Sequence, residues 1–279
     1  MNGPLIPFSS PGSIRLVSPE LALSVAGRAS CASLGIGILE QLVILNRAFG
    51  AEGPFSLAIT NVMGSAKFVR NLSVKSLRYI LAVGAIASIL GVVLGPYSLL
   101  GRSAFATLLV SVLIIRIRRV MGTDGAEQMA TLVLFAIFIA VLPSLSKTAI
   151  TLAVWFIGSQ SILSYATAGI AKAISPTWRA GVGISLIMGS EAHGQPFISV
   201  VLARFPVFAK LLCWLVVLFE CTFPLVLLAP EAITISMLLI GFVFHLGCAI
   251  SMGLNAFLFA FPGTYVCVAY IAQQMSPNW

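Results

Sequence analysis

Long uncharged apolar runs alternate with short polar stretches along the whole chain, and this pattern sets the predicted elements. A bilayer core of about 30 Å needs about 20 apolar residues in a helix, so each run is a candidate transmembrane span. The predicted spans are Val25–Leu45, Tyr79–Leu99, Ala104–Ile117, Gln128–Pro143, Ala149–Ala171, Phe208–Leu228 and Ile233–Leu254, with Phe257–Ala272 as a candidate eighth. The third and fourth are short, so they are either tilted or parts of one hairpin interrupted at Gly122–Gly125.

These runs predict an all-α fold, a polytopic transmembrane helix bundle of about seven spans, with a range of about six to eight. The chain has 279 residues, of which 59% are hydrophobic and 9% charged. An ordinary soluble domain has roughly 25% charged residues, so this composition cannot cover a water-soluble fold. No internal repeat or low-complexity linker divides residues 1–279, which we expect to form a single transmembrane domain.

The net charge of +8 does not indicate a nucleic-acid partner, because the Lys and Arg residues lie between the apolar runs. Alternate loops carry five, three and four cations, against two, one and one in the loops between them. The richer loops hold Arg47, Lys67, Arg70, Lys75, Arg78, then Arg116, Arg118, Arg119, then Lys172, Arg179, Arg204, Lys210. The positive-inside rule therefore predicts an outside N-terminus, unless a re-entrant segment between Ala51 and Lys75 inverts the order.

Charged side chains at membrane depth cost a few kcal/mol, so each is a functional hypothesis. Lys172 ends the fifth span after the small residues Ala168 and Gly169, which allow another helix to approach closely. A desolvated lysine can act as a base, and the alternative is that Lys172 snorkels to the headgroups. His245, inside the seventh span, either bonds a facing helix or shuttles a proton.

Other polar residues have structural interpretations beside functional ones. Glu220 is expected either to be protonated or to face a cation across the bundle. Arg28 and Glu40 lie too far apart on one helix to pair, so each requires a partner elsewhere. Asp124 either caps a helix or lines a cavity mouth, and Asn255 caps or links helices.

The sequence predicts no metal site and no common soluble chemistry. The five cysteines form no CxxC pair and have no histidine at ligand spacing. P-loop, dinucleotide-binding, GxSxG and HExxH patterns are absent from the sequence.

Two stretches resemble the HTTM family, the membrane domain shared by vitamin K-dependent gamma-carboxylase and the bacterial SdpB proteins. Ser164–Lys172, followed by Pro176–Trp178 and Gly181, is similar to the family pattern of an aromatic residue, Ala-Gly, Lys, then Trp and Gly. Phe244–Leu246, followed by Met252–Phe257, resembles the family's Phe-His-Leu helix. Gly27–Ser30 and Gly122–Gln128 resemble the start of the first helix and the acidic turn of the SdpB-like subgroup.

The resemblance implies site residues and a cofactor. In the carboxylase the matching lysine is the base that initiates oxygenation of a reduced quinone, which assigns Lys172 that role here. The matching histidine belongs to the same active site, which assigns His245 to it. Two departures argue against carboxylation: Gly122–Gln128 contains no histidine, and no large extramembrane domain is predicted. The carboxylase site also faces the exoplasmic side, whereas the charge count places the Lys172 loop inside.

The resemblance also implies a function. The compact length is similar to the SdpB-like subgroup, whose members act with an SdpA-like partner in maturation or export of a secreted, toxin-like peptide. We therefore expect a multi-pass protein of the cell membrane, of the bacterial plasma-membrane type, with a secreted peptide as substrate. The first alternative is a quinone-dependent membrane enzyme related to the carboxylase, and the second is a transporter or scaffold. Whether the chain is an enzyme stays open at this point.

Overall fold

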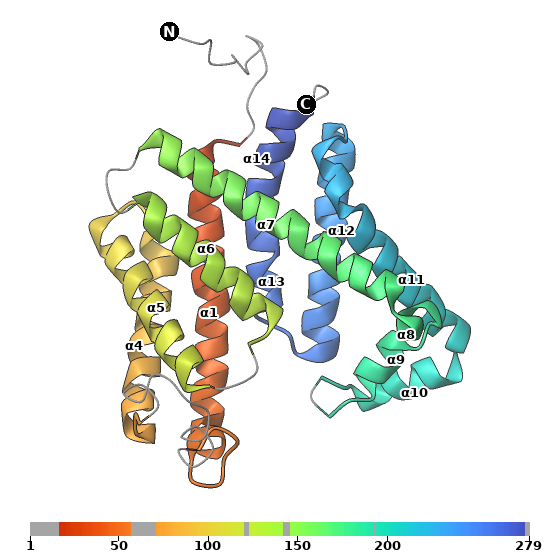
Figure 1. Cartoon of the computed structure of the whole chain (residues 1–279), viewed down its shortest axis with the longest axis horizontal. Coiled ribbons are helices and arrows are strands. Elements are labelled where there is room, and N and C mark those ends of the chain that lie inside the picture. Colours follow the sequence, from red (N-terminus) through yellow and green to blue (C-terminus); the bar gives the residue numbers. More distant parts are fainter. Residues whose placement is uncertain (1–16, 57–70, 120–122, 142–145, 192, 277–279) are drawn as a thin grey trace.

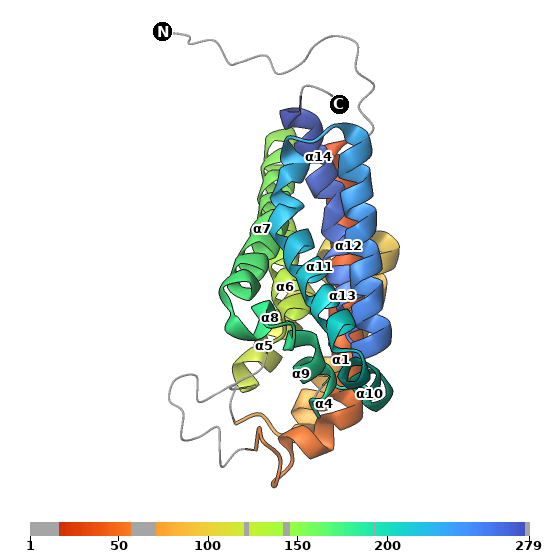
Figure 2. The ribbon, with the colours of Figure 1, turned by 90° about the vertical axis from the view of Figure 1, so that its right-hand side faces the viewer.

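The computed structural model describes residues 17–56, 71–119, 123–141, 146–191 and 193–276. Within these ranges every regular element is a helix (Figures 1 and 2). The elements are α1 (Pro19–Phe49), α4 (Val74–Leu94), α5 (Leu99–Arg118), α6 (Gly125–Val141), α7 (Lys147–Ile174), α8 (Pro176–Arg179), α9 (Gly183–Met188), α10 (Pro196–Arg204), α11 (Pro206–Thr222), η2 (Phe223–Leu227), α12 (Glu231–Met252), α13 (Phe257–Ala260), η3 (Pro262–Thr264) and α14 (Tyr265–Met275). Four residues named above lie outside the described ranges, namely Lys67, Arg70, Gly122 and Pro143.

The predicted fold class is confirmed. Among the described residues, six helices are long and apolar enough to cross a bilayer: α1, α4, α5, α7, α11 with η2, and α12. The apolar α6 is shorter, with 17 residues. The candidate eighth span is helical but broken into α13, η3 and α14, with Pro262 at the break, because proline cannot continue the hydrogen-bonded ladder. The chain is a multi-pass, all-α membrane bundle.

Serine side chains fix where several spans begin. Ser18, Ser73 and Ser98 each accept a hydrogen bond from the backbone N–H three residues later, at 3.0–3.1 Å. Each bond satisfies one of the backbone donors that the first helical turn leaves without a partner. Local sequence therefore sets the first residue of each of these spans, while the bilayer and tertiary packing stabilise the rest of the helix.

α1 and α4 form an antiparallel pair that is bonded at both ends. Near one end, Arg78 donates to the side-chain oxygen of Asn46 at 3.0 Å. Near the other, Arg28 donates to the main-chain carbonyl oxygens of Val92 and Val93, the latter at 2.8 Å. The expected partner of Arg28 is thus the carbonyl end of α4, where the helix dipole favours a cation. α4 begins at the same end of the bundle at which α1 ends. The two spans therefore alternate in direction, as the charge count assumed.

α5 and α6 are two separate antiparallel helices, and α5 is longer than the predicted third span. α5 begins at Leu99 rather than Ala104 and has 20 residues. Arg102, which precedes the predicted third span, lies in the first turn of α5 and donates to the carbonyl oxygen of Tyr97 at 3.2 Å. Its other contact is the carbonyl oxygen of Val141, at 3.4 Å. Backbone carbonyl oxygens at the end of α6 and in the turn before α5 thus compensate its charge.

α1 lies at the centre and packs against α4, α6 and α14, while α7 crosses the bundle diagonally (Figure 1). α11 and α12 lie on the far side of α7 from α4 and α5, and α8, α9 and α10 connect α7 to α11. We call the end of the bundle at which α1, α5 and α7 end and α4, α6 and α11 begin the cation-rich end. A second, smaller core, built from α7, α11, η2 and α14, underlies the site described next.

Candidate functional site

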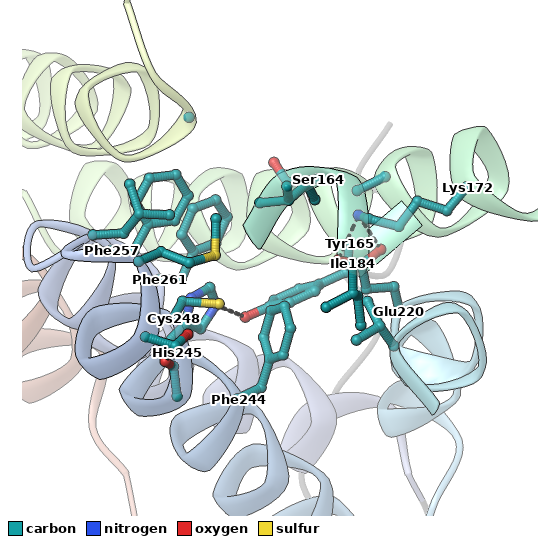
Figure 3. A pocket seen from close by; sticks show the side chains of 18 of the residues that line it. Ser164, Tyr165, Lys172, Ile184, Glu220, Phe244, His245, Cys248, Phe257 and Phe261 are labelled. Carbon is teal, nitrogen blue, oxygen red and sulfur yellow. Dashed lines mark hydrogen bonds and ion pairs between the residues drawn. The ribbon is translucent and has the colours of Figure 1, made fainter. Parts of the chain in front are cut away.

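A large cavity lies in the half of the bundle nearer the cation-rich end. Its volume is about 860 Å³. The second half of α7, together with α11, α12 and α13, forms its walls, and the first turn of α6 and the α8–α10 segment close its end. Its lining is mostly apolar, yet Lys172, Glu220 and His245 all contribute to it (Figure 3). Three of the residues singled out from the sequence therefore meet at one cavity.

Lys172 and Glu220 form an ion pair across α7 and α11. The Lys172 ammonium donates to both carboxylate oxygens of Glu220, at 2.8 Å to Oε1 and 2.6 Å to Oε2. The side chains are 23% and 5% exposed, respectively, and Nζ lies 5.3 Å from the centroid of the Trp178 ring. The expectation that Glu220 faces a cation is confirmed. Lys172 turns into the cavity, so it does not extend away to the headgroups.

Gly169 allows the two helices to approach closely enough for this pair. A Cβ atom at Gly169 would lie 2.6 Å from the backbone nitrogen of Cys221 and 2.8 Å from the carbonyl carbon of Glu220. Real Cβ atoms do not approach other atoms so closely, so only glycine fits without a shift of α11. Lys172 follows Gly169 by three residues and therefore lies on the same helix face. The close approach of α11 to Gly169 thus also places Glu220 beside Lys172.

This close approach gives a testable prediction. We expect Gly169→Ala to reduce the free energy of unfolding by about 1–3 kcal/mol, because the added methyl group overpacks the α7–α11 contact. Gly37→Ala is the matched control, since a Cβ at Gly37 meets nothing within 4 Å. Alanine is the better helix former, so the control variant should be neutral or more stable. Thermal unfolding of both variants in the same detergent measures the difference, and equal stability would contradict the packing described.

The floor of the cavity is a tight connection that folds back under α7. Gly181 has a φ of +83°, a left-handed conformation that favours glycine, and it lies against Lys210. A Cβ at Gly183 would lie 2.8 Å from the ring of Trp178, so this glycine lets the indole pack flat on the backbone. Gly183 thus helps to place Trp178 near Lys172, whereas Gly181, the glycine of the sequence pattern, makes the turn that packs on Lys210.

His245 is held by a chain of buried hydroxyl groups. Its Nε2 lies 2.5 Å from the hydroxyl oxygen of Tyr165, which lies 2.6 Å from that of Tyr265. His245 is 3% exposed, and its ring stacks on Phe261 with centroids 5.0 Å apart. Its Nδ1 is buried and has no hydrogen-bond partner among the described residues.

The hydrogen-bonded chain of Tyr265, Tyr165 and His245 contains three donor hydrogens, one on each tyrosine and one on neutral His245, but only two hydrogen bonds, so one donor has no partner among the described residues. Each tyrosine hydroxyl has one hydrogen to donate, and Tyr165 supplies the one side-chain partner found for Tyr265 in the described part of the chain. Both tyrosine hydrogens are used if Tyr265 donates to Tyr165 and Tyr165 donates to Nε2 of His245. In that arrangement neutral His245 carries its proton on Nδ1, a donor without a partner among the described residues. A buried donor without an acceptor costs about 1–3 kcal/mol, so this arrangement favours a ligand or water with an acceptor oxygen.

Tyr165, which the sequence did not assign to the site, links the two halves of it. Tyr165 and Lys172 are seven residues apart on α7, which is close to two helical turns and puts both on the cavity face. Figure 3 shows the Tyr165 ring between Lys172 and His245. Among the described residues no direct hydrogen bond joins Lys172 to His245, so the two residues share a cavity without touching. The seven-residue spacing was the signal that could have revealed Tyr165.

The remaining candidates lie elsewhere. Asp124 caps α6, because its Oδ1 accepts from the backbone N–H of Glu127 at 2.7 Å. Asn255 hydrogen-bonds the Glu40 carboxylate and so ties the turn after α12 to α1. Asp124, Glu40 and Glu127 line a separate cavity of about 200 Å³, together with Arg119, which pairs with Glu127. The capping interpretation of Asp124 is confirmed, and Arg28 serves the α1–α4 pair.

Comparison of the chain with known family profiles, with curated proteins and with solved structures gives no match. The HTTM resemblance therefore stays a prediction.

Proposed function

We propose that the chain is a membrane enzyme that binds a reduced quinone in the large cavity, with Lys172 as the residue that accepts its hydroxyl proton. The observation that carries this proposal is the buried Lys172–Glu220 pair at the wall of an otherwise apolar cavity. Ligand sites combine an apolar lining with a few placed polar groups, and titratable pairs in such places are candidates for acid–base chemistry.

The residues present fit a reduced quinone. The cavity volume of about 860 Å³ lies within the range of roughly 300–1,000 Å³ found for small-molecule sites. Two groups can contact hydroxyl groups of such a ring: the Lys172–Glu220 pair and the buried Nδ1 of His245, which has no hydrogen-bond partner among the described residues. Phe244, Phe257 and Phe261 supply the apolar remainder of the nearby wall.

The ion pair can store and release one proton. Transfer of a proton from Lys172 to Glu220 leaves a neutral amine and a neutral acid, and the net charge of the cavity does not change. The neutral amine then takes the hydroxyl proton of the ligand, and the resulting ammonium stabilises the negative charge left behind. When bound, a reduced quinone would supply two protons and two electrons, which together reduce dioxygen to hydrogen peroxide, and the proton taken up by Lys172 is one of the two. The Trp178 ring, whose centroid lies 5.3 Å from Nζ of Lys172, limits water near the pair, which strengthens its electrostatic interactions.

The other expected functions stay predictions. Maturation or export of a secreted peptide with an SdpA-like partner has no described feature that favours it over quinone chemistry. A transporter or scaffold would need no proton acceptor in the cavity. Both alternatives predict no oxidation of reduced quinone by the isolated protein, so one assay separates them from the proposal.

The assay uses the full chain in lipid nanodiscs supplied with a reduced, alkyl-tailed quinone and dioxygen. We expect oxygen uptake and quinone formation at equal rates, above the rates in nanodiscs without protein. Oxidation no faster than in the protein-free nanodiscs would contradict the proposed function.

A further inference from the structure

α11 and α12 enclose the cavity on one side but are not packed against each other along their length. They come together at η2 and diverge toward the cation-rich end (Figure 1), and Figure 2 looks onto this side of the bundle. α12 packs mainly on η2, α13, η3 and α14, and most of its surface is exposed. Side chains of both helices border the cavity on this side.

Several residues on this side both line the cavity and are exposed on the outer surface of the bundle. Leu212 and Val216 line the cavity from α11, and Val243, Gly247 and Ile250 line it from α12. Val243 is 64% exposed and Ile250 is 72% exposed, although both also line the cavity. Because α12 is a membrane-spanning candidate, its exposed apolar surface faces hydrocarbon chains. The cavity therefore opens sideways, toward lipid.

The floor of the cavity does not offer an equivalent route to water. Ile198 and Leu202 of α10 are one turn apart and line the cavity. The opposite side of this segment exposes Leu186, Phe197 and Val200. Exposed apolar side chains beside cations such as Arg204 are typical of a helix that lies in the membrane interface. The floor is thus itself embedded at the lipid boundary.

We propose that the gap between α11 and α12 is the access route to the cavity and holds the apolar tail of a single-tailed lipophilic ligand. The polar head points to Lys172, Glu220 and His245, and the tail passes Val216 and Gly247 into the bilayer. Lys172 is already neutralised by Glu220, so the site lacks the unpaired cation that a phosphate headgroup would require. The charge of the cavity thus favours a neutral ring head over a phospholipid. The identity of the ligand's polar head as a quinone ring rests on the proposed function, whereas the access route between α11 and α12 does not.

Gly247 offers a way to close the gap without disturbing the fold. A Cβ at Gly247 meets nothing within 4 Å, and the residue lines the cavity. Phenylalanine at this position should occupy the space of the tail. Leu239→Phe is the matched control, because Leu239 is exposed on the same helix and does not line the cavity.

The experiment is photolabelling of the full chain in nanodiscs with a quinone that carries a diazirine near the ring end of its alkyl tail. Peptide mass spectrometry should place the label on Val216, Val243 or Ile250, and excess unlabelled quinone should remove it. We expect Gly247→Phe to reduce this competed label at least fivefold and Leu239→Phe to leave it unchanged. Equal labelling in Gly247→Phe would overturn the proposal, as would competition by phosphatidylcholine but not by quinone.

Failure of the route and failure of the proposed function can be told apart. Competed label at the gap without any oxidation of reduced quinone supports the route and rejects the enzyme. Oxidation by the wild-type protein with label confined to α9 and α10 rejects the route and leaves the enzyme in place.

Discussion

Lys172→Arg should lower the rate of reduced-quinone oxidation by about 10²–10⁴-fold while the protein stays folded, since general-base catalysis contributes about that much. Arginine keeps the positive charge and can bond both oxygens of Glu220, so the ion pair survives. Its guanidinium does not give up a proton in proteins, so it cannot serve as the base. Initial rates of oxygen uptake in nanodiscs, at saturating quinone, measure the loss.

Lys147→Arg is the control for this prediction. Lys147 is the exposed first residue of the same helix, at the opposite end from the cavity, and its replacement should leave the rate unchanged. If Lys172→Arg oxidises reduced quinone as fast as the wild type, Lys172 is a structural partner of Glu220 and the base lies elsewhere.

Glu220→Ala is expected to lower the free energy of unfolding by about 3 kcal/mol. Removal of one partner of a buried pair leaves the other charge without compensation, which typically costs about 3–5 kcal/mol. The lower end of that range applies because Lys172 is 23% exposed. Denaturant unfolding in a single detergent, followed by circular dichroism, measures the change.

The double variant Lys172→Met, Glu220→Ala separates the pair from the packing around it. Methionine fills much of the lysine volume with no charge, so most of the stability lost in Glu220→Ala should return. An additive double variant, less stable than Glu220→Ala alone, would show that the two side chains stabilise the protein independently.

The sequence predicted the spans because hydropathy reports which segments enter a bilayer. It also singled out Lys172, Glu220 and His245, because ionisable residues at membrane depth are costly. It did not predict that Lys172 pairs with Glu220, which is 48 residues away, since that depends on the rotation of α7 against α11. Gly169 fixes that rotation through a backbone contact that no periodicity reveals.

Other parts of the site depend on features that the sequence pattern carries weakly. α8, α9 and α10 were not predicted, because each is too short to show a clear periodicity. Arg102 made the third span look short, and the structure shows that the backbone carbonyl oxygens of Tyr97 and Val141 accept its hydrogen bonds. For Asp124 the sequence left open a helix cap or a cavity mouth, and for Asn255 a cap or a link between helices. Tertiary packing decides the details, because it places Asp124 at a second cavity and bonds Asn255 to Glu40.

The positive-inside rule and the HTTM resemblance predict opposite sides of the membrane for the cavity. The cavity lies in the half of the bundle nearer the cation-rich end, which the positive-inside rule places in the cytoplasm. The HTTM resemblance predicts a site that faces the exoplasmic side. An opening between α11 and α12 makes the chemistry less dependent on this choice, because a lipid-soluble ligand reaches the cavity from within the membrane.

The central claim is that the cavity beside Lys172 and Glu220 is a binding site for a reduced quinone. The most direct test is to titrate the full chain in nanodiscs with reduced, alkyl-tailed quinone, then to isolate the nanodiscs and quantify the extracted quinone per chain. The account predicts a saturable component of one molecule per chain above the linear partition into lipid. Linear partition alone, equal to that of nanodiscs without protein, would contradict it.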